Sequence, residues 1–170
     1  MKELFDRAGD AMAGSAPMQD YADRHGVVAL PMLTIIDDEM ADFVAESLRP
    51  QIEGRTVVEI GGGIGLLALH MGFRARRVYC IEANPLWAAS FLSALMAVKP
   101  KNVSFLFGAA DEFAGQITAD VAVFCTHSGV ENMRAAASLF APTVIDVYGE
   151  MIARDPEKFD RLARTLRPMA

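Results

Sequence analysis

Short apolar runs alternate with longer segments of helical pattern along the chain from residue 54 onward. The runs are rich in valine, isoleucine and other residues that favour strands, and the segments between them are long enough for helices. Strands and helices in repeated alternation are typical of βαβ units and a parallel sheet. The pattern predicts five strands, over residues 56–60, 77–82, 103–107, 121–125 and 143–148.

Helices are predicted between most of these strands and towards both ends of the chain. Asn84-Pro85 favours a helix start, because proline suits the first helical turn. Upstream of the first strand, acidic residues 37–39 precede an amphipathic pattern that Pro50 helps to end. The predicted helices cover residues 4–13, 40–48, 66–73, 85–98, 130–140 and 155–166.

The predicted helix over residues 85–98 is apolar on nearly every side. Its large apolar residues include Trp87, Phe91, Leu92 and Met96. Such a helix has to be covered on more than one face. Either the N-terminal segment or a second subunit supplies the cover, and we predict a homodimer or a larger assembly.

The chain has 170 residues, the usual size of one domain. We interpret residues 1–53 as an N-terminal helical extension or lid and residues 54–170 as the core. Hydrophobic residues make up 52% and charged residues 22% of the chain, so intrinsic disorder is excluded. No apolar run approaches the ~20 residues of a membrane span and the N-terminus lacks a signal-peptide pattern, so the expected location is the cytoplasm.

The net charge of −6 argues against nucleic acid as a partner, because a surface that tracks phosphates needs an excess of basic residues. Cys80 and Cys125 both lie in apolar stretches, which favours buried thiols over a disulfide or a metal pair. No metal site is predicted.

The segment from Glu59 to Gly65 carries the strongest chemical signal. It places an acid at the end of a strand and glycines in the turn that enters a helix. Glycine permits positive φ and lacks a Cβ, so the turn can be sharp and a ligand can approach the main chain closely. In a doubly wound sheet this turn lies at the carboxyl edge, where cofactors bind. Glu82 ends the second predicted strand, where a carboxylate can accept hydrogen bonds from both hydroxyls of a ribose.

Two interpretations of these residues remain at this point. The glycines and Glu82 either bind a nucleotide or form no more than a tight turn and a solvated strand end. Dinucleotide sites use the pattern G-x-G-x-x-G, whose turn receives a pyrophosphate. Here Gly65 comes one residue early, and a carboxylate at Glu59 repels pyrophosphate but suits a ligand with an ammonium and a sulfonium group. The charge pattern therefore favours S-adenosylmethionine over NAD.

Residues 57–67, VVEIGGGIGLL, resemble motif I of class I S-adenosylmethionine-dependent methyltransferases. The resemblance implies an α/β fold with a doubly wound, mainly parallel Rossmann-like sheet of about five strands, in the order 3-2-1-4-5. It also implies that the backbone of Gly61, Gly63 and Gly65 lines the amino-acid part of the cofactor and that Glu82 holds the ribose.

The loop at residues 108–111 is similar to the adenine-binding loop of the same family. The similarity implies that Asp111 accepts a hydrogen bond from the adenine amino group, with Ala110 beside it, although common members have aspartate where this chain has Ala109. The full set of cofactor-binding residues that we expect is Glu59, Gly61, Gly63, Gly65, Glu82, Ala83, Ala110, Asp111 and Thr126.

Methyl transfer from a sulfonium is a displacement at an activated carbon, so the protein mainly aligns the reactants and excludes water. The segment after the fourth strand should emerge beside the methyl group. His127 is the candidate general base there, because imidazole titrates near neutrality. The alternative is a loop histidine without proton transfer. Thr126 and Ser128 either bind the substrate or cap the next helix.

The acceptor of the methyl group stays unnamed. Branches of the family that act on amines or nucleobases carry an (N/D)PPY-type motif after the fourth strand, and the arginine branch carries glutamates. Residues 125–129 contain neither. We expect an acceptor that is small or presented by a protein partner.

Two further polar residues lie within apolar patterns. We interpret His70, on the predicted helix 66–73, as structural. Asp146 interrupts an otherwise apolar strand, so it either faces a polar partner or lies on an edge strand, because a lone buried carboxylate is costly.

The sequence therefore predicts an S-adenosylmethionine-dependent methyltransferase. The alternatives are a cofactor-binding module or subunit without its own catalysis and, less favoured, an NAD-binding oxidoreductase domain. A complete methyltransferase core usually adds two strands after the fifth, whereas about 20 residues follow Tyr148 here. Either the sheet stops at five strands or the N-terminal extension and a partner chain supply the missing part.

Overall fold

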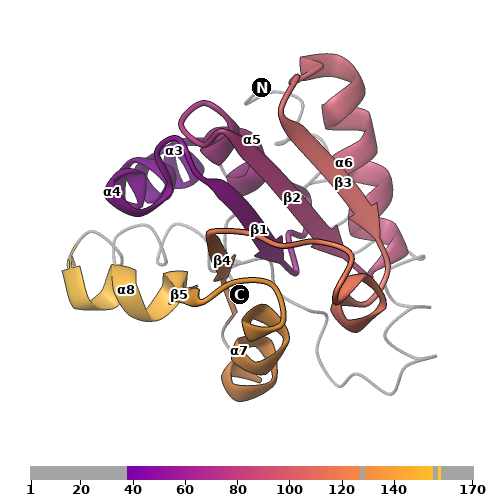
Figure 1. Ribbon diagram of the computed structural model, residues 1–170. Coiled ribbons are helices and arrows are strands. Elements are labelled where there is room, and N and C mark those ends of the chain that lie inside the picture. The colour runs from indigo at the N-terminus through magenta and orange to yellow at the C-terminus, as the bar shows by residue number, and fades with distance from the viewer. Residues whose placement is uncertain (1–37, 127–128, 155–156, 158–170) are drawn as a thin grey trace, which may run out of the picture.

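The computed structural model describes residues 38–126, 129–154 and 157. Its centre is a five-stranded sheet in the order β3-β2-β1-β4-β5, in which every neighbouring pair is parallel (Figure 1). The elements are α3 (Asp38–Ser47), α4 (Arg49–Ile52), β1 (Thr56–Ile60), α5 (Leu66–Gly72), β2 (Arg77–Glu82), α6 (Pro85–Val98), β3 (Val103–Phe107), η1 (Ala110–Phe113), β4 (Val121–Phe124), α7 (Val130–Ser138), β5 (Thr143–Asp146) and α8 (Val147–Arg154).

The sheet confirms the predicted α/β class, the five parallel strands and their order. The central strand, β1, pairs with β2 on one side and β4 on the other, and Ile60 is the register partner of both Ile81 and Phe124. Because all five strands run in one direction, their carboxyl ends lie at the same edge of the sheet. The loops that follow the strands therefore meet at this edge.

The strands separate two hydrophobic cores, because successive side chains point to opposite faces. Val57 and Val123 pack in the core that contains α3, α4, α5 and α6, whereas Val58 and Phe124 pack in the core that contains α7. Glu59 has the same parity as Val57. Its side chain therefore lies on the α5 face of the sheet.

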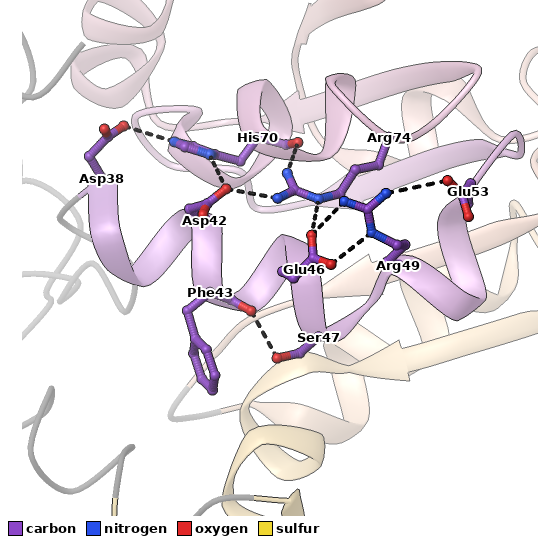
Figure 2. A network of polar contacts seen from close by, with 9 residues as sticks. All are labelled: Asp38, Asp42, Phe43, Glu46, Ser47, Arg49, Glu53, His70 and Arg74. Atoms are coloured by element: carbon purple, nitrogen blue, oxygen red, sulfur yellow. Dashed lines mark hydrogen bonds and ion pairs between the residues drawn. The ribbon is translucent and has the colours of Figure 1, made fainter.

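A polar network joins α3 to α5 (Figure 2). The ring nitrogens of His70 lie 2.8 Å from Asp38 Oδ1 and 3.3 Å from Asp42 Oδ1. Arg74 donates to Asp42 at 2.8 Å and to Glu46 at 2.9 Å. These contacts confirm the structural interpretation of His70, which is buried at the contact between the two helices.

The arginines of this network stabilise the ionised form of its carboxyl groups. Hydrogen bonding and charge from Arg74 lower the pKa of Asp42. Arg49 and Arg74 together lower the pKa of Glu46 to about 2. Arg49 completes the network by bonding to both carboxylate oxygens of Glu46, at 2.8 and 2.7 Å.

Helix α6 is only partly covered. Trp87 and Phe91 are buried against the sheet, whereas Leu92 is 48% exposed and Met96 75% exposed. The homodimer predicted from this helix stays a prediction, which light scattering at micromolar protein concentration tests.

The structure corrects several of the sequence-based boundaries. Strand β5 ends at Asp146 rather than Tyr148, and the unpredicted helix α8 follows directly. Asp146 Oδ1 accepts the N–H of Gly149 at 3.1 Å, so this carboxylate caps α8. Since β5 is also an edge strand, both interpretations offered for Asp146 hold. Pro50 lies in the first turn of α4 rather than ending α3, which stops at Ser47. Helix α7 is two residues shorter than predicted, and β4 one residue shorter.

Several predictions lie outside the described residues: the helix over residues 4–13, all but one position of the helix over residues 155–166, and residues 1–37 of the N-terminal extension. The proposed division at residue 53 and the cytoplasmic location stay predictions. Within the part of the chain that the structure describes, no helix is both long enough and apolar enough to cross a membrane.

Candidate functional site

The glycine turn after β1 packs directly on the carboxyl ends of β1 and β2. The N–H groups of Gly61 and Gly62 both donate to Ile81 O, at 2.9 and 3.1 Å. A Cβ at Gly62 would overlap Cys80 Sγ. A Cβ at Gly65, where φ is +80°, would overlap the ring of Phe91. Close packing therefore requires glycine at these two positions.

Glu82 connects three loops at this edge. Its Oε2 accepts the N–H of Gly63 at 2.7 Å, its Oε1 accepts the N–H of Asn84 at 2.6 Å, and its carbonyl oxygen accepts the N–H of Gly108 at 3.1 Å. Burial raises the pKa of Glu82, and the amides of Asn84 and Gly63 oppose that shift. Each carboxylate oxygen can accept more than one hydrogen bond, so both retain capacity for a ribose hydroxyl.

Glu59 lies beneath the glycine turn. The side chain is 4% exposed, and burial raises its pKa to about 8, against the opposing effect of hydrogen bonds from Cys80 and the backbone of Ala68. Its Oε2 has no hydrogen-bond partner among the described residues. Glu59 is therefore mainly protonated at neutral pH in this state, which revises the expectation of a charged carboxylate at the turn.

Cys80 is the register partner of Glu59 and packs on the same face of the sheet. Burial, with the nearby carboxyl groups of Glu59 and Glu82, raises the pKa of its thiol well above the usual range. Cys80 is a buried thiol, as predicted, whereas Cys125, for which a buried thiol was also predicted, is half-buried; neither cysteine forms a disulfide.

The loop after β3 reaches the same edge. Ala110 and Asp111 lie in the first turn of η1, and Asp111 is exposed. The N–H of Ala109 donates to Glu112 Oε2 at 3.2 Å. Glu112 therefore shapes this loop, and Asp111 remains available for a ligand. The assignment of Asp111 and Ala110 to adenine stays a prediction.

The remaining predicted residues lie beside these loops or outside the described chain. Ala83 is exposed between Glu82 and Asn84, and Thr126 is half-buried two residues after β4. His127 and Ser128 lie outside the described residues, so the role of His127 stays a prediction.

Sequence reasoning missed three side chains of the site. Asn84 is buried, and its N–H bonds to Glu82. Met133 of α7 reaches the glycine turn, since its Cε lies 3.0 Å from the position of a Cβ on Gly61. Arg134 lies against the ends of β4 and β5. The alternation of β2 is a sequence signal for one further contact of the site, that between Cys80 and Glu59. No local sequence pattern indicates Asn84, Met133 or Arg134.

The described residues contain no group of three histidine, cysteine, aspartate or glutamate side chains that is placed to hold a metal ion. The groups at this edge are instead a close-packed glycine turn, the buried and mainly neutral acid Glu59, and the buried acid Glu82, which bonds to loop amides.

Comparison with known proteins identifies the fold. No protein-family model and no curated protein sequence matches the chain. Among solved structures, precorrin-6y C5,15-methyltransferase from Geobacter metallireducens superposes with a TM-score of 0.54 at 17% identity, over 64% of this chain and 59% of that one. The chain has the fold of class I S-adenosylmethionine-dependent methyltransferases.

Two further structures share the methyltransferase fold. A Methanococcus maripaludis protein proposed to be an S-adenosyl-L-methionine-dependent methyltransferase gives a TM-score of 0.52 at 14% identity, over 76% of this chain and 73% of that one. Coclaurine N-methyltransferase bound to N-methylheliamine and SAH gives 0.50 at 17% identity, over 62% and 32%. The chain thus spans less than two thirds of the length of the Geobacter enzyme and about a third of coclaurine N-methyltransferase.

Proposed function

We propose that this chain binds S-adenosylmethionine at the carboxyl edge of its sheet and transfers the methyl group to an acceptor. The observation that carries the proposal is the junction of the glycine turn with Glu82, where the N–H of Gly63 and a buried carboxylate meet at 2.7 Å. The methyltransferase fold and the cofactor named for two of the similar structures support it.

The residues present fit this cofactor. Glu82 would accept hydrogen bonds from the ribose, and the exposed carboxylate of Asp111 would accept one from the adenine amino group. Beneath the turn, Oε2 of Glu59 is a buried polar atom without a hydrogen-bond partner among the described residues. When bound, the cofactor supplies a methyl group on a sulfonium, already activated for displacement.

Two alternatives predict different binding. A cofactor-binding module without catalysis would bind S-adenosylmethionine but leave it intact. An NAD-binding domain would bind NAD. Because burial keeps the Glu59 side chain mainly neutral, it would repel the pyrophosphate of NAD less than the sequence suggested. The early third glycine, Gly65, still argues against NAD.

Calorimetric titration with S-adenosylmethionine, S-adenosylhomocysteine and NAD distinguishes S-adenosylmethionine binding from NAD binding. We expect the first two to bind and NAD not to bind. Binding of NAD alone would refute the proposal. Gly63 has φ of +58°, so Gly63→Val should abolish binding by straining the turn and filling the space beside the main chain.

Glu82→Ala should weaken S-adenosylhomocysteine binding at least tenfold, because it removes both the ribose acceptor and the anchor of Gly63. The matched control is Asp120→Ala. Asp120 Oδ2 also accepts a backbone N–H at 2.7 Å, from Thr56, but at the opposite edge of the sheet. Calorimetry should show a loss of affinity only in the first variant, and equal losses in both would show that Glu82 acts through stability alone.

We propose His127 as the general base of the transfer. His127→Ala should then spare S-adenosylhomocysteine binding and abolish turnover once an acceptor is known. A loss of cofactor affinity in this variant would assign His127 a structural role instead.

A further inference from the structure

Arg134 occupies a different part of the sheet from the other arginines near the strands. Arg55 and Arg77 adjoin the starts of β1 and β2, and Arg76 pairs with Asp120 just before β4. Arg134 instead lies one turn into α7, against the final residues of β4 and β5. A cationic side chain therefore stands at the carboxyl edge, where the reactants would meet.

Two side chains hold the guanidinium of Arg134 in place. Its Cζ lies 5.7 Å from the centre of the Phe124 ring, within cation–π range, and its Nη2 lies 3.9 Å from Asp146 Oδ2. Phe124 and Asp146 are register partners on adjacent strands. Because Asp146 also caps α8 through Gly149, its carboxylate is fixed by a second contact.

Among the residues that the structure describes, these contacts leave most of the hydrogen-bonding capacity of Arg134 unused. A separation of 3.9 Å is too long for a hydrogen bond, so Asp146 attracts the guanidinium without accepting from it. A guanidinium has five N–H donors in a planar fork, a geometry that matches the two oxygens of a carboxylate or phosphate. The side chain is 45% exposed, so a ligand can reach it.

The position of Arg134 relative to the cofactor residues indicates which reactant it serves. Glu82 ends β2, and Asp111 follows β3, so the cofactor would cover the β1-β2-β3 half of the edge. Arg134 contacts the β4-β5 half. Apart from Thr126, which follows β4 and is also expected to contact the cofactor, that half is left for the acceptor.

Resting on the proposed function, we propose that Arg134 positions an acceptor that carries an anionic group, a carboxylate or a phosphate, by pairing with its oxygens. Phe124 and Asp146 hold the guanidinium ready, and Met133, the preceding residue on α7, contacts the glycine turn. The same helix thus connects the acceptor site to the cofactor site.

The test uses the whole chain and two simple probes, inorganic phosphate and acetate, each titrated with and without S-adenosylhomocysteine. The signals followed are the Arg134 Nε–Hε resonance and the backbone amides after β4, measured by ¹⁵N NMR. We expect saturable shifts in both, with at least tenfold weaker binding in R134Q and an intermediate affinity in R134K, because lysine keeps the charge but loses the fork. The matched control is R76Q, since Arg76 forms an Arg–Asp pair at the opposite edge and is 67% exposed.

Equal shifts in wild type and R134Q, or no saturable shift in wild type, would overturn the proposal. Tighter phosphate or acetate binding in R134Q would also overturn it, and would indicate that the edge does not use this cation. Acetate binding without phosphate binding would assign the site to carboxylates, and the reverse to phosphates. Absence of S-adenosylhomocysteine binding would refute the proposed function, whereas its binding without anion binding would refute the role of Arg134 alone.

Discussion

The acidic side chains beneath the glycine turn and those between α3 and α5 lie in opposite environments. Glu59 and Glu82 are 4% and 7% exposed, and burial raises the pKa of both. Asp42 and Glu46 lie at the surface, where Arg74 hydrogen bonds to both. Arg74 lowers the pKa of Asp42, and Arg49 together with Arg74 lowers the pKa of Glu46. The first pair favours the neutral form of the acid, and the second favours the ionised form.

The difference distinguishes the candidate functional site from a structural contact between helices. A buried acid without a cationic partner costs stability, and strongly perturbed acids cluster at functional sites for that reason. A surface acid that bonds to arginine costs little and contributes to the contact between two helices. The glycine turn is therefore a region where the fold gives up stability, as the proposed cofactor binding would require, and the α3–α5 contact is a region where it gains stability.

The largest expected effect is at the glycine turn. Gly65→Ala would place a Cβ on the ring of Phe91 and force a left-handed backbone on a residue with a side chain. We expect a loss of about 3–5 kcal/mol in the free energy of unfolding, measured by urea denaturation. Gly115→Ala is the control, because Gly115 has φ of +77° but open space around it, and should lose only about 1–2 kcal/mol. Equal losses would show that the turn is not closely packed.

Glu59→Gln should reveal the cost of the buried acid. Because folding raises the pKa of Glu59 from 4.5 to about 8, its contribution to stability is fully present below pH 4.5 and is lost as the pH rises through 8. The variant should match wild type at pH 4 and be more stable by about 2–4 kcal/mol at pH 9. Urea denaturation at both pH values measures this. A difference that is constant with pH would contradict the raised pKa.

The smallest effect should come from Glu46→Gln and have the opposite pH dependence. Folding lowers the pKa of Glu46 to about 2, so its contribution to stability is present above pH 4.5 and is lost as the pH falls through 2. The variant should be slightly less stable than wild type at pH 7 and equal to it near pH 2. Thermal unfolding at low salt measures the difference, which added salt should reduce. A variant as stable as wild type at pH 7 would show that this ion pair contributes nothing.

Much of the fold follows from local patterns. The bounds of β1, β2, β3 and α6 agree with the prediction, because β-branched runs bounded by glycine, proline or asparagine specify strands and helix starts locally. The predicted end of β5, at Tyr148, was wrong for an identifiable reason. Val147 and Tyr148 continue the apolar run, and the cap that Asp146 provides to α8 outweighs their preference for strand.

The candidate site is predictable in part. Glu59, Glu82 and the glycines are recognisable from their order along the chain. The burial that makes Glu59 mainly neutral is not, because it depends on α5 and Cys80 closing over the side chain. The role of Arg134 is likewise not predictable, because the sequence does not distinguish it from other polar residues. Its position depends on contacts with the adjacent ends of β4 and β5.

The sequence by itself determined the alternation of strands and helices, the position of the glycine turn and the acid at the end of β2, because each depends on residues within a few positions of one another. Tertiary structure alone decided the charge state of Glu59, the bond between Glu82 and Gly63, and the contact of Arg134 with Phe124 and Asp146. Those properties depend on burial and on distances between loops that only the assembled sheet brings together.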